Sequence, residues 1–273
     1  MCGDHSVRAT TGTGTSDHAL TRARVSADAL VQGAPHKQRR AWLDQALVTR
    51  RDGEPPPPFT VLTRSATRDA VALKIELTLC WLLGVHGKIP GDRLLLDADA
   101  LCGVIGLDPG AAAYRRIDRA LRTLRAEGLV ALTPAPRGRR VVAPLWGSWR
   151  RSPGVDAGEA SANRRHLVLL REFWTNGWCA ALPGNAIVVL LALLYMRAAV
   201  DPEGDGIGLF VTDSVRERRF GFSSDFYYAG RKALVDAGLV SLRWEPIDSE
   251  AHGDRRRAVA TLRLGALDGS PTG

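Results

Sequence analysis

The sequence predicts an α+β fold, mostly helical, in which one arrangement of helices and strands occurs twice along the chain. The first observation is a helix with a broad apolar face near the start of each half, at residues 69–85 and 185–199. The second is that a shorter helix, a turn and a longer helix then follow in both halves. The third is that each longer helix ends in Gly-Leu-Val and precedes two strand-like runs.

Composition indicates a folded chain with a polyanionic partner. The chain has 273 residues, of which 45% are hydrophobic and 24% charged, and it is long enough for two domains of roughly 100 to 130 residues. The net charge of +8 favours nucleic acid or an anionic membrane surface as partner. The positive surplus is almost all arginine. Because arginine is also abundant in proteins encoded by GC-rich genomes, the number of arginines alone does not establish such a partner.

Two stretches of linker-like composition divide the chain. The N-terminal stretch is rich in Thr, Ser, Gly and Arg without periodicity, which predicts a disordered basic tail. A second break, "GSWRRSPGVDAGEASANRRH", separates the two repeats. The expected organisation is a disordered tail, a first domain with an N-terminal extension, a linker, a second domain and a disordered C-terminus, at residues 1–40, 41–146, 147–165, 166–264 and 265–273.

The junction between the repeats carries tryptophans on both sides. Apolar rings of this size are costly to leave in water, so we expect them to pack the two domains against each other. The residues concerned are Trp146, Trp149, Trp174 and Trp178.

Features of secreted and membrane proteins are not expected. The N-terminus has no apolar segment of the secretory type, and the longest apolar run, residues 186–196, is shorter than the roughly 17 to 25 residues of a membrane span. That run predicts a buried helix. The four cysteines are far apart, which is typical of reduced thiols in the cytoplasm, and Cys80 and Cys102 occur in apolar helical pattern as small hydrophobes.

The third helix of the first repeat has two different faces. Ile117, Leu121 and Leu124 recur at helical spacing and predict a buried stripe, and Gly128 supplies the stop. Arginines recur at the same spacing on another face, at positions 115, 119 and 122. For an isolated helix, a solvated charged face is the simplest interpretation. In the preceding helix, Asp97 or Asp99 is expected to cap the N-terminus.

The second repeat follows the same order with different side chains. Its second helix is "TDSVRERRFGF", and a Ser-Ser turn leads to a third helix at residues 225–238. Of the consecutive aromatic residues Phe226, Tyr227 and Tyr228, we expect one or two to lie in the core. The strand pairs are "LVAL" with "RVVAPLW" in the first repeat and "LVSLRW" with "RAVATLRL" in the second.

Three helices followed by a hairpin resemble the winged helix-turn-helix domain. The segments "ALRTLRAEGLVAL" and "GRKALVDAGLVSL" are similar to the helix-to-strand transition of that superfamily, and the resemblance covers residues 59–146 and 166–264. Two such domains in tandem resemble some plasmid replication initiators. The second half, with "REFWTNGWCAALPGNAIVVLLALL", also resembles uncharacterised actinobacterial winged-helix proteins.

This resemblance implies double-stranded DNA as the partner. The third helix of a winged helix enters the major groove, where the planar fork of arginine can bind guanine or phosphate. In the first domain the implied DNA contacts are Tyr114, Arg115, Arg116, Arg119 and Arg122 on the helix, and Arg137, Arg139 and Arg140 on the hairpin. In the second they are Ser224, Tyr228, Arg231, Lys232, Arg255 and Arg256.

The second hairpin departs from this pattern. It mixes its arginines with four acids, Glu245, Asp248, Glu250 and Asp254, and is a poor phosphate clamp. The second domain could therefore bind a protein or a second copy of the chain, as a homodimer.

Catalytic and cofactor motifs are not expected. "TGTGTS" has no Walker lysine, and neither H-E-x-x-H nor G-x-S-x-G occurs. We expect no enzyme, no metal and no small-molecule cofactor. The predicted function is double-stranded DNA binding, with sequence specificity, by a replication initiator or transcriptional regulator in the bacterial cytoplasm, at the nucleoid or a plasmid. An architectural or scaffold protein that uses winged helices for protein contacts is the alternative.

Overall fold

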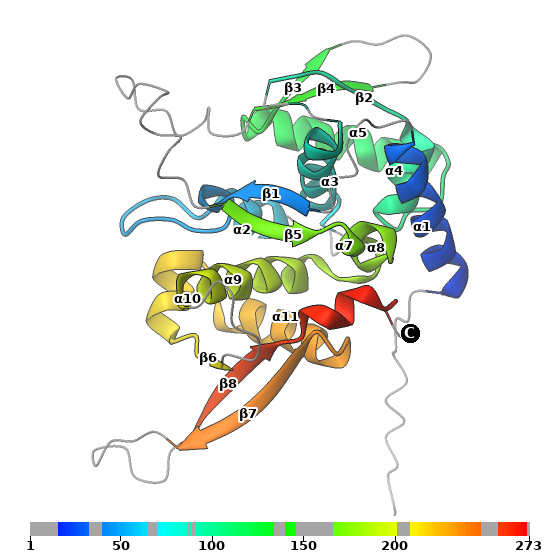
Figure 1. Ribbon diagram of the computed structural model, residues 1–273. Coiled ribbons are helices and arrows are strands. Elements are labelled where there is room, and N and C mark those ends of the chain that lie inside the picture. Colours follow the sequence, from blue (N-terminus) through cyan, green and yellow to red (C-terminus); the bar gives the residue numbers. More distant parts are fainter. Residues whose placement is uncertain are drawn as a thin grey trace, which may run out of the picture.

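The structure is a computed structural model that combines helices with small antiparallel sheets, which confirms the predicted α+β class (Figure 1). It describes residues 16–32, 40–64, 70–86, 88, 91–133, 140–145, 166–200, 208–246 and 256–271. The linker expected at residues 147–165 lies outside this part of the chain.

The first repeat forms three helices and a three-stranded antiparallel sheet. The strand between its first two helices pairs with the last strand of the repeat, so the order in the sheet is β2-β4-β3. The elements in chain order are α3 (Val71–Val85), β2 (Leu94–Leu96), α4 (Ala98–Val104), α5 (Ala111–Ala126), β3 (Val130–Thr133) and β4 (Arg140–Pro144).

The second repeat has the same order of elements and the same strand pairing. Its sheet has the order β6-β8-β7, again with the short first strand beside the last. The helices and hairpins were predicted from the sequence, but the short strands β2 and β6 were not. The elements are α9 (Gly184–Val200), β6 (Gly208–Leu209), α10 (Asp213–Phe220), α11 (Ser224–Asp236), β7 (Val240–Pro246) and β8 (Arg256–Leu262).

The two longer helices end in the same way. Gly128 after α5 and Gly238 after α11 have φ of +68° and +72°, a conformation that L side chains rarely adopt. The amides of the next residues, Leu129 and Leu239, donate to the carbonyl five residues earlier at 2.9 and 3.0 Å. These bonds are part of the glycine-terminated helix end that the sequence predicts.

The core is continuous between the repeats. Almost every side chain of α3 is buried, and so is the N-terminal two thirds of α9, as its apolar run predicts. The prediction that Cys80 and Cys102 lie in the core is also confirmed. Buried residues of both repeats belong to one hydrophobic cluster. The two repeats are therefore packed together rather than joined only through the linker.

A strand pair and a ring stack form the junction. Strand β1 (Arg40–Asp44), in the N-terminal extension, pairs antiparallel with β5 (His166–Leu170) of the second half. Trp174, in α7 (Glu172–Thr175), stacks on Trp81 of α3 with ring centroids 4.9 Å apart, and its Nε1 donates to Thr78 at 3.3 Å. The expected burial of Trp174 and Trp178 is confirmed; Trp146 and Trp149 lie outside the described residues.

The junction also contains a buried lysine. Lys74 of α3 donates from Nζ to the carbonyl of Ala180, in α8 (Trp178–Ala181), at 2.9 Å. Burial lowers the pKa of this lysine, because removal from water disfavours its charged form. The hydrogen bond joins the first helix of one repeat to the segment that leads into the other. Between β1 and α3 the chain forms η1 (Gln45–Leu47) and α2 (Pro58–Arg64), and α2 contacts both α3 and α9.

Both chain ends differ from the prediction. Residues 17–31 of the expected disordered tail form helix α1 (Asp17–Val31), which packs on α4 and α7 through a narrow stripe that includes Leu20, Ala23 and Ala27. The expected disordered C-terminus contains η2 (Leu264–Asp268), where the buried Leu267 accepts a hydrogen bond from Trp178 Nε1 at 3.2 Å. The small residues of α1 gave too weak an apolar period to reveal the helix.

Candidate nucleic-acid interface

Helix α5 presents an arginine face to solvent. Arg115, Arg119 and Arg122 are exposed, while Ile117 and Leu121 on the opposite side have only 2% of their surface accessible. The predicted separation of a buried stripe from a charged face is therefore confirmed. The three guanidinium groups recur at i, i+4 and i+7, so they follow one side of the helix over about two turns.

An ion pair ties the first hairpin to this helix. Arg140, at the start of β4, donates from Nε and Nη2 to Oδ1 of Asp118 in α5, at 2.9 and 2.8 Å. The pair offsets the charge of Asp118 next to the arginine face. It also ties the loop end of β4 to the helix. The other predicted hairpin contacts, Arg137 and Arg139, lie outside the described residues.

Two further predicted residues of α5 differ from this exposed row. The hydroxyl of Tyr114 donates to the carboxylate of Asp99 in α4, and this hydrogen bond raises the pKa of the tyrosine. Arg116 is half-buried. The structure therefore separates these two residues from the exposed set at 115, 119 and 122.

Helix α11 carries a mixed face. Ser224, Tyr228 and Lys232 are exposed, and Lys232 pairs with Asp236 at 2.6 Å. The guanidinium of Arg231 lies over the rings of Tyr227 and Tyr228, at 5.6 and 4.9 Å from their centroids. As expected for the aromatic run, one ring, that of Tyr227, is buried. This face has less unpaired positive charge than that of α5.

The second hairpin combines ion-paired side chains with an exposed ring. Glu245 pairs with Arg243 and, at 3.5 Å, with Arg257. Arg256 is exposed, and Arg255 lies outside the described residues. Trp244, directly opposite Ala258 in the hairpin, has 60% of its surface exposed. This tryptophan is not among the contacts predicted from the sequence, although the alternation Val240, Leu242, Trp244 places it on the face that begins in the core.

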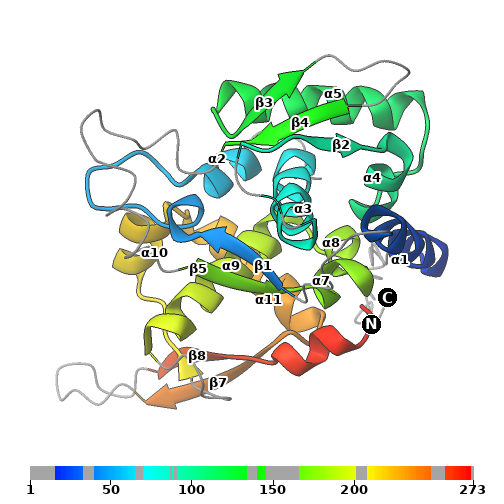
Figure 2. The same ribbon diagram turned by 45° about the horizontal axis from the view of Figure 1, so that its top comes forward.

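The two candidate surfaces lie far apart along the molecule. Hairpins β3-β4 and β7-β8 project from opposite ends in both views (Figures 1 and 2). Helix α5 lies in the half of the molecule that carries β3-β4, and helix α11 in the half that carries β7-β8. The structure therefore does not gather the predicted residues into one site, but presents two separate surfaces on one packed body.

A metal centre and a membrane span are not found in the described residues. These residues contain no cluster of His, Cys, Asp or Glu able to hold a metal, and no helix with the length and apolarity of a membrane span. Burial raises the pKa of the Cys102 and Cys179 thiols to about 11, so these groups stay protonated near neutral pH. The prediction that Asp97 caps α4 is confirmed, since its Oδ1 accepts from the amides of Asp99 and Ala100 at 2.9 Å.

The chain matched no protein-family model, no curated protein and no solved structure. A functional proposal therefore depends on the two surfaces and on the units that carry them. The arginine face of α5 is the more strongly charged of the two.

Proposed function

We propose that the chain is a sequence-specific double-stranded DNA-binding protein built from two winged helix-turn-helix units. The observation that carries the proposal is the exposed row Arg115, Arg119 and Arg122 on α5, beside a hairpin fixed to the same helix. In the cell it would act as a plasmid-type replication initiator or a transcriptional regulator, in the bacterial cytoplasm at a plasmid or the nucleoid.

The topology of each unit supports this proposal. The plan of a winged helix is a helix, a short strand, two helices and a hairpin whose last strand pairs with the first. Both repeats have this order of elements and this strand pairing, which supports the proposal. In that plan the third helix, here α5 or α11, enters the major groove and the hairpin forms the wing. The most cationic surface described above then faces the DNA.

Arginine is suited both to recognising a base and to binding phosphate at such a surface. Its guanidinium can donate two parallel hydrogen bonds to O6 and N7 of a guanine, which distinguishes this base pair from the others. It can also bind phosphate oxygens, which adds affinity without specificity. The pair of Asp118 with Arg140 positions the wing relative to α5, so that Arg137 and Arg139 are the proposed phosphate contacts of the wing.

Selection of bound sequences from a random duplex pool tests the proposal. We expect one enriched motif, together with an affinity that falls as salt concentration rises, because cationic contacts release counterions from DNA. The motif would show specificity and the layout of the target in one experiment. No enrichment and no salt-dependent binding to any duplex would contradict the proposal.

Charge reversal in the first wing should weaken binding to all sequences alike. Arg137→Glu with Arg139→Glu removes two proposed phosphate contacts, and each lost contact should reduce the log-log salt slope by about 1. Titrations at several salt concentrations, with the selected duplex and a scrambled one, measure both effects. Loss of specific binding alone, with nonspecific binding unchanged, would instead make the wing a base-contacting element.

An architectural role is the second candidate, favoured by the second hairpin. Glu245 pairs with two of its arginines, and the exposed Trp244 offers an apolar contact to a second copy of the chain. Under this alternative, sedimentation should show a dimer that Trp244→Ser converts to monomer. A wild-type chain that sediments as a monomer at micromolar concentration would remove the support for it.

A further inference from the structure

We infer that Arg50 and Thr60 of the N-terminal extension form the C-terminal cap of α10 and thereby position α11, the second proposed recognition helix. The inference deepens the proposed function and rests on it for the role of α11. The cap itself is a feature of the folded chain and can be tested without DNA.

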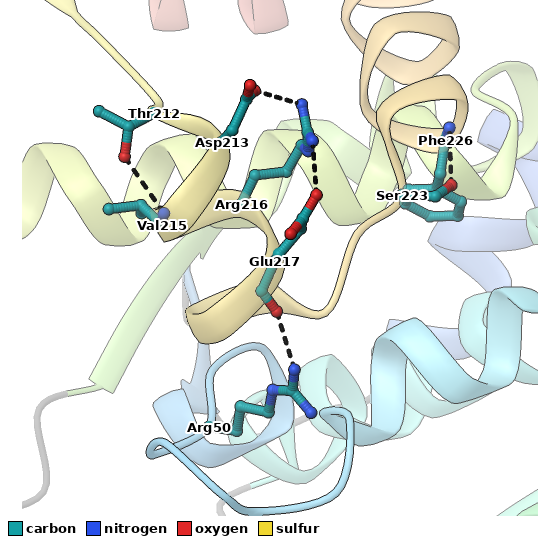
Figure 3. A network of polar contacts seen from close by, with 8 residues as sticks. All are labelled: Arg50, Thr212, Asp213, Val215, Arg216, Glu217, Ser223 and Phe226. Carbon is teal, nitrogen blue, oxygen red and sulfur yellow. Dashed lines mark hydrogen bonds and ion pairs between the residues drawn. The ribbon is translucent and has the colours of Figure 1, made fainter.

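Arg50 supplies donors to three successive carbonyls at the end of α10. Its Nη2 donates to the carbonyl of Glu217 and its Nε to that of Arg218, each at 2.8 Å, and its backbone amide donates to that of Arg219 at 2.9 Å. Figure 3 shows the guanidinium of Arg50 below the last turn of the helix, with the bond to Glu217 drawn. A fourth bond, from Nη1 to the carbonyl of Glu54 at 2.8 Å, holds the guanidinium in its own loop.

Thr60 completes the set. Its hydroxyl, in the buried N-terminal turn of α2, donates to the carbonyl of Phe220 at 2.8 Å. The carbonyls of all four residues from 217 to 220 therefore accept a hydrogen bond from a segment about 160 positions away in the sequence. These are the last four carbonyls of the helix, the ones that most need partners from outside it; that of Glu217 also accepts from the amide of Gly221 at 3.1 Å.

The charge of Arg50 suits this position. The C-terminal end of a helix carries a partial negative charge, and a guanidinium placed there stabilises it. The side chain of Glu217 is occupied elsewhere, because it accepts from the buried Arg216 at 2.9 Å (Figure 3). Arg216 also pairs with Asp213 at 2.6 Å. Glu217 is thus held at its backbone by Arg50 and at its side chain by Arg216.

The end of α10 determines where α11 begins. Only three residues separate the helices: Gly221, with φ of +69°, Phe222, and Ser223, whose hydroxyl caps α11 by accepting from the amide of Phe226 at 3.3 Å. A turn this short leaves little freedom between the two axes. A cap that fixes residues 217–220 therefore also fixes the start of α11 and the direction in which its exposed residues point.

Hydrogen exchange on the full chain tests the cap, with Arg51→Ala as the matched control. Arg51 is the neighbouring exposed arginine. Its amide donates to the Glu54 carboxylate at 2.9 Å and its carbonyl accepts from the Glu54 amide at 3.2 Å, so within the described residues its hydrogen bonds come from its backbone. In Arg50→Ala we expect amides of residues 217–226 to exchange about tenfold faster, because two charge-assisted bonds are lost. Exchange in α5 should not change. Arg50→Lys should restore part of the protection lost in Arg50→Ala, since the lysine ammonium keeps the positive charge but lacks the planar set of N–H donors of a guanidinium.

The effect on DNA binding is measured by footprinting on the duplex selected from the random pool. Arg50→Ala should weaken protection of the half-site bound by α11, by about tenfold, and leave that bound by α5 unchanged. Thr60→Val, which removes only the hydroxyl, should produce a smaller effect at the same place.

The outcomes separate the two proposals. Exchange in α10 equal to that of Arg51→Ala, or faster exchange throughout the chain with equal loss at both half-sites, would overturn the inference. Faster exchange confined to residues 217–226, in a chain that protects no duplex, would support the cap and contradict the proposed function.

Discussion

Replacement of Arg115, Arg119 and Arg122 together by alanine is expected to lower affinity for the selected duplex more than a hundredfold without unfolding the chain. Each base-contacting arginine contributes about 1 to 3 kcal/mol of discrimination, and about 1.4 kcal/mol is a factor of ten in binding. Loss of three gives at least about 3 kcal/mol. The fold should tolerate the change because all three side chains are exposed.

Two measurements establish this result. Fluorescence anisotropy with labelled duplex gives the affinity, and thermal unfolding followed by circular dichroism gives the stability. Leu121→Ala, on the buried stripe of the same helix, is the control with the opposite expectation: removal of a side chain with 2% exposure should cost about 2 to 5 kcal/mol of stability.

The single replacements locate the contacts. Each of Arg115→Ala, Arg119→Ala and Arg122→Ala should relax specificity at one base pair when the selection is repeated, if that arginine contacts a base. A uniform loss across all sequences would assign the side chain to phosphate. Unchanged affinity in all three variants would refute α5 as a recognition helix.

Local pattern was sufficient to predict most helices and both hairpins. The period of Ile117, Leu121 and Leu124 gave the buried face of α5, and Gly128 gave its end. These signals work because each depends on residues within a few positions of one another. They failed for β2 and β6, which have three and two residues and are too short to show alternation.

Contacts between distant segments were not predictable from the sequence. The pairing of β1 with β5 and the bonds from Arg50 to α10 join residues more than a hundred positions apart, and no local period reports them. The same is true within the candidate site. A charged residue in a helix pattern can face solvent or an internal partner, and only the structure shows that Arg140 binds Asp118 and that Tyr114 binds Asp99.

The packing of the two repeats makes a prediction about target layout. A shared core, the β1-β5 pair and the stack of Trp81 on Trp174 hold the units together. If α5 and α11 both enter the major groove, the target has two half-sites at one fixed separation, about one helical turn of 34 to 36 Å or a multiple of it. The half-sites should differ in sequence, because the exposed residues of the two helices differ, and the α5 half-site should contribute more affinity.

Insertions between the half-sites test this fixed separation. About five extra base pairs turn the second half-site to the opposite face of the duplex, and about ten restore the face but add roughly one turn of length. Two domains on a flexible linker would regain affinity with ten. Units joined by a common core cannot extend by that distance, so we expect both insertions to reduce affinity to that of the α5 half-site alone.

Footprinting on the three duplexes, with zero, five and ten added base pairs, decides between these cases. Protection of both half-sites should occur only without an insertion, while the α5 half-site stays protected in all three. Equal protection at every spacing would mean that the repeats separate in solution despite the junction between α3 and α7. Protection of the α5 half-site alone on the unmodified duplex would mean that α11 does not contact DNA, and would favour a protein-binding role for the second unit, where Trp244 is exposed.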